Sequence, residues 1–220
     1  MCLVPRLALF PAILALAFTA YFVDASARTY RTVPKDGKNV VQFVSDATLE
    51  RIVGRTSSLS GSADLDLANI KAISKASFEV DLRTIDTGIA MRNQDMRTNY
   101  FETDKFPKAT FVLHRVVSSD TTVLTPERPV NMVVEGEFTV RGVSKTYQIP
   151  VTLRYTPGEA NSEVGQRLYG SPGALVNVTA EWSVRLSDHG IIRPAFLFMR
   201  LAEEQKVSIA FALTDVLPKR

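Results

Sequence analysis

The sequence predicts a single antiparallel all-β domain that closes into a barrel, and three observations lead to this prediction. Apolar and polar side chains alternate with period two over about eight segments, which is typical of half-buried strands. The 220 residues are 45% hydrophobic and 22% charged, a globular composition that excludes a disordered or collagen-like chain. Eight amphipathic strands favour closure, because a closed barrel leaves no exposed sheet edge.

Two alternatives stay open at this point. A β-sandwich fits the number of strands almost as well as a barrel, and periodicity does not separate them. An eight-stranded barrel has an interior that side chains can just fill, or that holds one slender ligand. The pattern is therefore compatible with a solid core and with a cavity.

The first 27 residues have the features of a secretory signal peptide. Arg6 precedes an apolar run over 7–23, and the small-residue triplet Ala25–Ser26–Ala27 follows it. We expect export, cleavage after residue 27, and a mature domain over 28–220. The alternative is an uncleaved anchor, but the run is shorter than the roughly 20 residues that span a bilayer. The only cysteine, Cys2, would leave with this segment, so we expect no disulfide.

The expected strands follow one another between residues 41 and 213. Alternation is clearest over 147–155, 176–186 and 207–213. Shorter segments of the same kind are 41–43, 63–67, 78–82, 111–113 and 132–140. Gly136 interrupts the last of these, which predicts a bulge there.

Two stretches interrupt the strand pattern. Helix-like spacing of apolar residues predicts a short helical insertion near 89–99, and an apolar stretch near 190–200 predicts a second insert, irregular or helical. Turns are expected at 34–39, 125–129, 157–159 and 171–173, which are rich in turn-forming residues.

A series of motifs occurs in a fixed order along the chain. They are Thr84–Gly88 (TIDTG), Met91–Asn93 (MRN), Met96–Arg97 (MR), Tyr100–Pro107 (YFETDKFP), Ala109–Phe111 (ATF), Gly136–Lys145 (GEFTVRGVSK) and Leu186–Ile191 (LSDHGI). This series resembles the YceI-like family of bacterial secreted proteins, and the similarity runs from about Asn39 to Leu213. The chain departs from the commonest family pattern in two places: the strand 40–45 has no His, and Asn93 stands where many members have Asp.

The resemblance implies a lipocalin-like eight-stranded antiparallel barrel around a long apolar tunnel. Members are associated with polyisoprenoid chains, such as those of isoprenoid quinones, usually in the periplasm. We therefore expect an exported, non-catalytic protein that binds an isoprenoid lipid in the barrel for storage or transport. The alternative function is a solid-core interaction module of the cell envelope that binds no lipid.

The residues expected to line an apolar cavity are mostly aromatic and lie one to a strand. They are Phe43, Phe78, Phe111, Phe138, Trp182 and Phe211 from the strands, with Met91, Met96 and Phe196 from the two inserts acting as lids. The same rings could fill a solid core, and paired methionines more commonly serve helix packing.

A polar cluster near the first insert has two interpretations. Arg92 is expected near the mouth of the cavity, where it could contact a ligand head group. The structural interpretation is favoured: Asp86 suits a turn or a helix cap, and Arg92 can pair with Asp95 across one helical turn.

We expect no catalysis, no cofactor and no metal. His114 and His189 are the only histidines, and no G-x-S-x-G or H-E-x-x-H motif occurs. Ser187, Asp188 and His189 have the residue types of a hydrolytic triad, but neighbours on a strand point to opposite faces.

The charge distribution gives no sign of a nucleic-acid partner. The net charge is only +3, and no run of four basic residues occurs. Transient contact with a membrane is compatible with the sequence, and the oligomeric state, monomer or dimer, stays open.

Overall fold

The computed structural model describes residues 27–33, 38–46, 50–73, 75–126, 128–192 and 201–216. The strands within these ranges are β1 (Arg28–Thr32), β2 (Val40–Asp46), β3 (Arg51–Thr56), β4 (Leu59–Leu65), β5 (Ala76–Asp81), β6 (Lys108–Ser119), β7 (Val130–Val140), β8 (Val143–Thr156), β9 (Leu175–Arg185) and β10 (Glu204–Thr214). The helices are α1 (Ala90–Asp95) and α2 (Gly158–Tyr169). Short helical turns are η1 (Ile70–Ala72), η2 (Leu82–Thr84), the π-helical η3 (Met96–Tyr100) and η4 (Ser187–His189).

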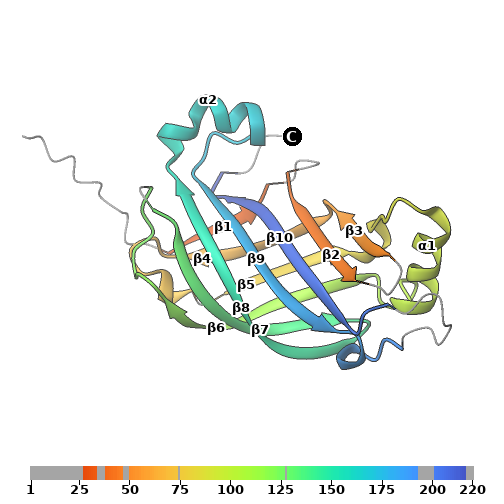
Figure 1. The fold of residues 1–220 in the computed structure, drawn as a ribbon. Coiled ribbons are helices and arrows are strands. Elements are labelled where there is room, and N and C mark those ends of the chain that lie inside the picture. The colour runs from red at the N-terminus through yellow and green to blue at the C-terminus, as the bar shows by residue number, and fades with distance from the viewer. Residues whose placement is uncertain are drawn as a thin grey trace, which may run out of the picture.

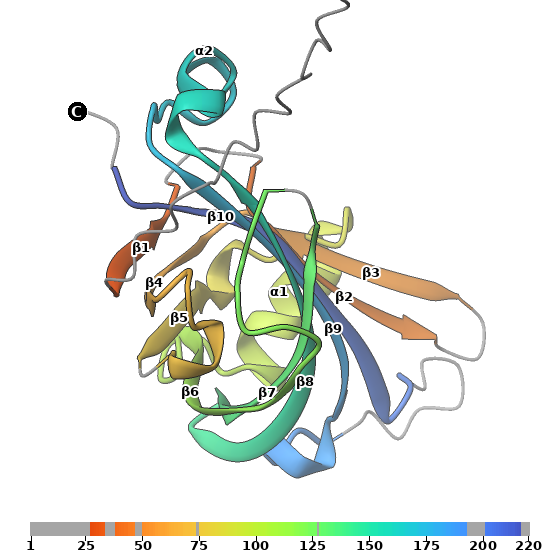
Figure 2. The same cartoon turned by 90° about the vertical axis from the view of Figure 1, so that its left-hand side faces the viewer.

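The strands form a closed antiparallel barrel. They hydrogen-bond in the order β1-β4-β5-β6-β7-β8-β9-β10-β2-β3, and β1 pairs again with β10. The circuit from β1 through β4 to β10 and back contains eight strands, so the predicted eight-stranded barrel is confirmed and a sandwich is wrong. Figures 1 and 2 show this ring of strands, with α1 at its far end in Figure 2.

The hairpin of β2 and β3 extends the barrel at one end. β1 pairs with Leu213 and Thr214 of β10, whereas β2 pairs with the same edge of β10 further back, over 206–210. β1 and β2 thus act as two parts of one interrupted strand. The alternation in the sequence identifies β2 and β4 to β10 but misses β1 and β3. Both are short, and Gly54 breaks the apolar pattern of β3.

Antiparallel order places the connections at two ends of the barrel. At one end lie α1 and η3, which join β5 to β6, the turn between β7 and β8, and η4 after β9. At the opposite end lie η1 and α2, which joins β8 to β9 (Figure 1). These are called the α1 end and the α2 end below.

The α2 end is sealed by packed apolar side chains. Ile70 and Leu124 are fully buried there, together with Tyr30, Val130, Val176 and Leu213. Two backbone hydrogen bonds join the segments that carry Ile70 and Leu124, from Ile70 N to Thr122 O (2.7 Å) and from Leu124 N to Leu67 O (2.8 Å). Full burial of each large apolar side chain contributes about 1.5–3 kcal/mol, so this end forms a stable floor.

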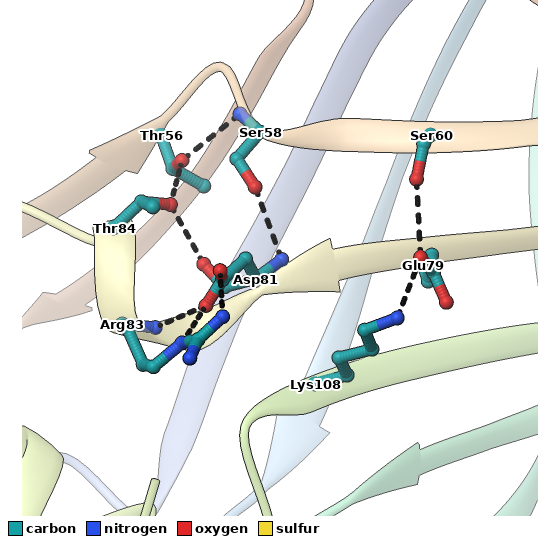
Figure 3. Close-up of polar contacts among 8 residues, drawn as sticks. All are labelled: Thr56, Ser58, Ser60, Glu79, Asp81, Arg83, Thr84 and Lys108. Carbon is teal, nitrogen blue, oxygen red and sulfur yellow. Dashed lines mark hydrogen bonds and ion pairs between the residues drawn. The ribbon is translucent and has the colours of Figure 1, made fainter.

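A small polar network fixes the bend where β3 gives way to β4. The hydroxyls of Thr56 and Thr84 lie 2.6 Å apart, and Thr84 Oγ1 also donates to the carbonyl of Asp81 (2.7 Å). Ser58 Oγ accepts from the backbone N–H of Asp81 (3.2 Å), and Thr56 Oγ1 accepts from that of Ser58 (3.0 Å) (Figure 3). These contacts tie the bend to the end of β5 and to η2.

Two ion pairs support the same region from the barrel exterior. Arg83 binds both carboxylate oxygens of Asp81, and its side-chain hydrogen bonds hold the pKa of that carboxyl below its usual value. Lys108 of β6 donates to Glu79 of β5 (2.8 Å), as Figure 3 also shows. Asp81 therefore acts as a structural group at the end of β5.

The predicted insertions have mixed outcomes. The helix expected near 89–99 is confirmed by α1 and η3. Most of the insert expected near 190–200 lies outside the described residues. Helix α2 was not expected, because its sequence shows only a turn at 157–159 and contains two glycines, which are poor helix formers. It ends at Gly170, whose φ of 69° is the left-handed conformation that glycine adopts without strain.

The bulge expected at Gly136 lies on the partner strand. Leu113 of β6 opposes Gly136 and Arg115 opposes Glu135, so His114 is the extra residue. Gly136 has a packing reason instead. A Cβ at this position would lie 2.4 Å from Cζ of Phe111 and 2.5 Å from the carbonyl oxygen of Val112.

We predict that Gly136→Val lowers the free energy of unfolding by about 1–3 kcal/mol, because the added side chain displaces the Phe111 ring and the β6 backbone. Urea unfolding followed by circular dichroism measures the change. Gly158→Ala at the start of α2 is the control. Its Cβ would meet nothing closer than 3.3 Å, so we expect a change below about 1 kcal/mol. Equal effects of the two substitutions would contradict the packing explanation.

Candidate ligand cavity

The barrel encloses an apolar cavity of about 290 Å³. This is close to the lower limit of about 300 Å³ for small-molecule sites. Alternate residues of β2 to β10 form most of its wall, as the period-two pattern requires. Along β10 the lining residues are Gln205, Val207, Ile209, Phe211 and Leu213.

All six aromatic residues predicted from the strands line this cavity. They are Phe43, Phe78, Phe111, Phe138, Trp182 and Phe211. Neighbouring rings contact one another: the centroids of Phe78 and Phe211 lie 5.1 Å apart, and Phe138 meets Trp182 edge-on at 5.6 Å. Apart from Phe211, these rings are only partly buried although they point inward. The rings therefore form a wall around a space and do not fill a solid core.

The two methionines of the first insert have different positions. Met96 is buried and lines the cavity. Met91 does not line it, because its side chain is 82% exposed, so the expectation of a cavity contact there is wrong. Arg92, Asp95 and Met96 share the cavity-facing side of the helix through their spacing of three and four residues, and Met91 lies about 100° away around the axis. Phe196 lies outside the described residues.

Polar lining residues gather at the α1 end. They include Gln42, Glu50, Arg92, Asp95, Thr110, His189 and Gln205. The side chain of Glu50 is 52% exposed, so the cavity reaches the surface beside it. The α1 end is therefore the mouth of the cavity, and the sealed α2 end is its floor.

Arg92 lies at this mouth, as predicted, and connects α1 to the start of β3. Its Nη1 donates to Glu50 Oε1 (2.8 Å) and its Nε to Thr87 Oγ1 (3.0 Å). The expected pairing with Asp95 is wrong, since Asp95 instead accepts a hydrogen bond from Asn99 (2.6 Å). Arg92 thus holds the mouth together while its side chain borders the cavity.

Asp86 organises the turn before α1, which confirms its structural interpretation. Its Oδ1 accepts from the backbone N–H of Gly88 (2.8 Å) and from Asn93 Nδ2 (2.6 Å), and these bonds lower the pKa of the carboxyl. Asn93 Oδ1 accepts in turn from the backbone N–H and the hydroxyl of Thr87 (2.8 and 2.7 Å). An ionised Asp at position 93 could not donate to Asp86, so the amide suits this partly buried network.

His189 is a buried wall residue with both ring nitrogens occupied. Nδ1 lies 2.9 Å from the carbonyl oxygen of Val143, which only accepts, so Nδ1 donates. Nε2 then accepts from the hydroxyl of Tyr147 (3.1 Å). Burial lowers the pKa of the imidazole and keeps it neutral. Ser187, Asp188 and His189 form the helical turn η4, whereas the sequence predicted that they lie on a strand.

Two polar atoms near the mouth, Trp182 Nε1 and Gln205 Oε1, have no hydrogen-bond partner among the described residues. The indole Nε1 of Trp182 is covered and donates to no described residue. The amide nitrogen of Gln205 donates to Ser45 Oγ (3.1 Å) and to the carbonyl of Ala202 (2.6 Å). Its amide oxygen, Oε1, accepts a hydrogen bond from no described residue. Sequence reasoning missed Gln205, although it occupies the position two residues before Val207 in the alternating pattern.

Within the described ranges, no three His, Cys, Asp or Glu side chains come together in a way that could hold a metal ion. Among the helices of those ranges, none has the length and hydropathy needed to cross a bilayer.

Fold and cavity define a small antiparallel barrel with one apolar internal site. Residues 30–214 match the YceI-like domain, so the chain belongs to the YceI-like family. No relative was found among curated proteins.

Solved structures share the fold at low sequence identity. BcnA of Burkholderia cenocepacia is 19% identical with a TM-score of 0.61, covering 80% of this chain and 96% of its own. A polyisoprenoid binding domain from Saccharophagus degradans, implicated in plant cell wall breakdown, is 17% identical with a TM-score of 0.59, covering 86% and 99%. The YCEI protein of Campylobacter jejuni is 14% identical with a TM-score of 0.57, covering 75% and 85%.

We predict that the free energy of unfolding falls as the pH drops below the ordinary histidine value of 6.5, because the unfolded chain takes up a proton that buried His189 resists. His189→Asn should flatten this dependence between pH 7 and pH 5. Chemical unfolding at a series of pH values measures it. His114→Asn, at an exposed position of β6, should keep the wild-type slope. An unchanged slope in His189→Asn would contradict this assignment.

Proposed function

We propose that this protein is an exported, non-catalytic carrier that binds a polyisoprenoid chain, such as that of an isoprenoid quinone, inside its barrel for storage or transport. The observation that carries the proposal is the apolar cavity with a sealed floor and a polar mouth. Such a site suits a molecule with a long apolar chain and one polar end. The S. degradans domain, described as polyisoprenoid binding, supports the same ligand class.

The physical gain from enclosing such a chain is large. Each buried CH₂ contributes about 0.8 kcal/mol, so some twenty carbons would gain roughly 16 kcal/mol before binding costs. This gain, before binding costs are subtracted, is close to the ceiling of about 18–21 kcal/mol for non-covalent complexes. We therefore expect the ligand to stay bound through purification.

The solid-core interaction module is the weaker candidate. Its core would be filled, whereas the inward rings of this barrel surround a cavity. Export rests on the sequence of residues 1–27, which has the charged start, apolar run and small-residue end of a signal peptide. We propose the periplasm, or the space outside the cell, as the place of action.

The first test is mass spectrometry on the protein purified from its native compartment. We expect an organic extract to contain a stoichiometric polyprenyl species, whose mass gives the chain length and the head group. The intact-protein mass should correspond to residues 28–220. The proposal would be contradicted if well-folded protein yielded an extract without a polyprenyl species and also failed to take up added prenyl lipid.

A second test blocks the cavity from the wall. Ala180 lines it on β9, whereas its neighbour Thr179 is exposed on the outer face of the same strand. We predict that Ala180→Phe reduces the retained lipid at least about tenfold, since the ring occupies space that the chain needs. Thr179→Phe, the matched control, should retain the wild-type amount. Equal retention in both variants would show that the lipid binds elsewhere.

A further inference from the structure

Gln205 is the most deeply buried polar side chain that borders the cavity with an unused hydrogen-bonding atom. Only 6% of the residue is exposed. It lies on the inner face of β10, directly opposite Ser45 of β2, at the α1 end. Its Oε1 accepts no hydrogen bond from any described residue, although a buried amide oxygen normally has a partner.

The orientation of this amide is fixed by its other end. Nε2 donates to the carbonyl of Ala202 at 2.6 Å, and a carbonyl cannot donate back, so a flipped amide would place two acceptors together. Ser45 Oγ, which is fully buried, accepts the second N–H at 3.1 Å. Oε1 is therefore held away from these partners.

Oε1 is also open to an incoming group. In the described part of the chain, the only fully covered side-chain polar atoms without a partner are Asn39 Oδ1 and Trp182 Nε1. Gln205 Oε1 is not one of them, so it is not fully covered, and Gln205 is a lining residue of the cavity. Trp182 lies on the neighbouring strand, opposite Val207, and contributes an unpaired donor to the same end of the wall.

We propose that the mouth recognises a hydrogen-bond donor on the ligand, a hydroxyl group at the polar end of its apolar chain, and that Gln205 Oε1 accepts this hydrogen bond. The inference rests on the proposed function, because it specifies the ligand of the same cavity. A ligand that only accepts, such as an ether, would cover Oε1 and leave it unpaired. An unmade hydrogen bond of this kind is costly, so the site should discriminate between the two ligands.

The test compares geranylgeraniol with its methyl ether, which keeps the chain and removes the donor. Trp182 is the only tryptophan and lines the cavity, so its fluorescence reports binding in the lipid-free protein. We expect the alcohol to bind about tenfold more tightly than the ether, the scale of one buried hydrogen bond. Equal affinities would overturn the inference and leave the proposed function standing. If neither compound binds to well-folded protein, both fail.

Two variants show whether Gln205 carries the discrimination. In Gln205→Leu the ratio of affinities should fall close to one, because Leu has no acceptor; a mere steric effect of the ether methyl group would persist. Gln205→Met, which keeps an unbranched side chain, serves the same purpose if Leu disturbs the β2–β10 contact. Gln148→Leu on the exposed outer face of β8 is the matched control and should keep the tenfold ratio. A tenfold ratio retained in a folded Gln205 variant would overturn the assignment.

Discussion

The pairing of β1 with β10 is the interaction on which the rest of the structure depends. Arg31 and Thr32 meet Thr214 and Leu213, and Val33 adds a hydrogen bond to the carbonyl of Ala212 (3.0 Å). These few contacts join β1 to the last residues of β10, and the bridge between Arg55 of β3 and Asp86 closes the ring at the α1 end. Without the β1–β10 contacts, β1 and the last residues of β10, which β2 does not cover, would have free edges, and the apolar inner face would be open to water there. The enclosed cavity is thus a consequence of closure.

The two ends of the barrel then differ because different chain segments cover them. The α2 end receives large apolar residues from η1 and from the β6–β7 connection, and these seal it. The α1 end receives a short helix whose cavity-facing residues include Arg92 and Asp95, and polar atoms therefore border the opening. This asymmetry gives the cavity a direction, with an apolar floor and a polar mouth, and a chain-like ligand would enter with its apolar end first.

Most polar groups of the mouth form hydrogen bonds with one another or with nearby residues, and these bonds fix the shape of the mouth. Arg92 binds Glu50 and Thr87, Asp86 and Asn93 bind each other, and His189 has a partner at each ring nitrogen. Polar groups that are satisfied in this way stabilise one geometry of the opening and leave little capacity for a ligand. Gln205 differs, because its amide nitrogen is fixed by protein partners and its oxygen has none in the described part of the chain.

The class of fold, the inward and outward faces of the strands and six aromatic residues of the cavity wall follow from local sequence, because alternation along a strand decides which side chains share a face. The position of α1 and the structural role of Asp86 follow from it too, since both depend on local turn chemistry. The remaining features depend on contacts between distant segments. Closure by β1, too short to show a period, depends on a partner strand about 180 residues away in sequence. Met91 turned outward because the rotation of α1 on the barrel is set by packing, and the roles of Gln205 and His189 depend on atoms brought near by β2 and β8. No local pattern encodes such long-range contacts.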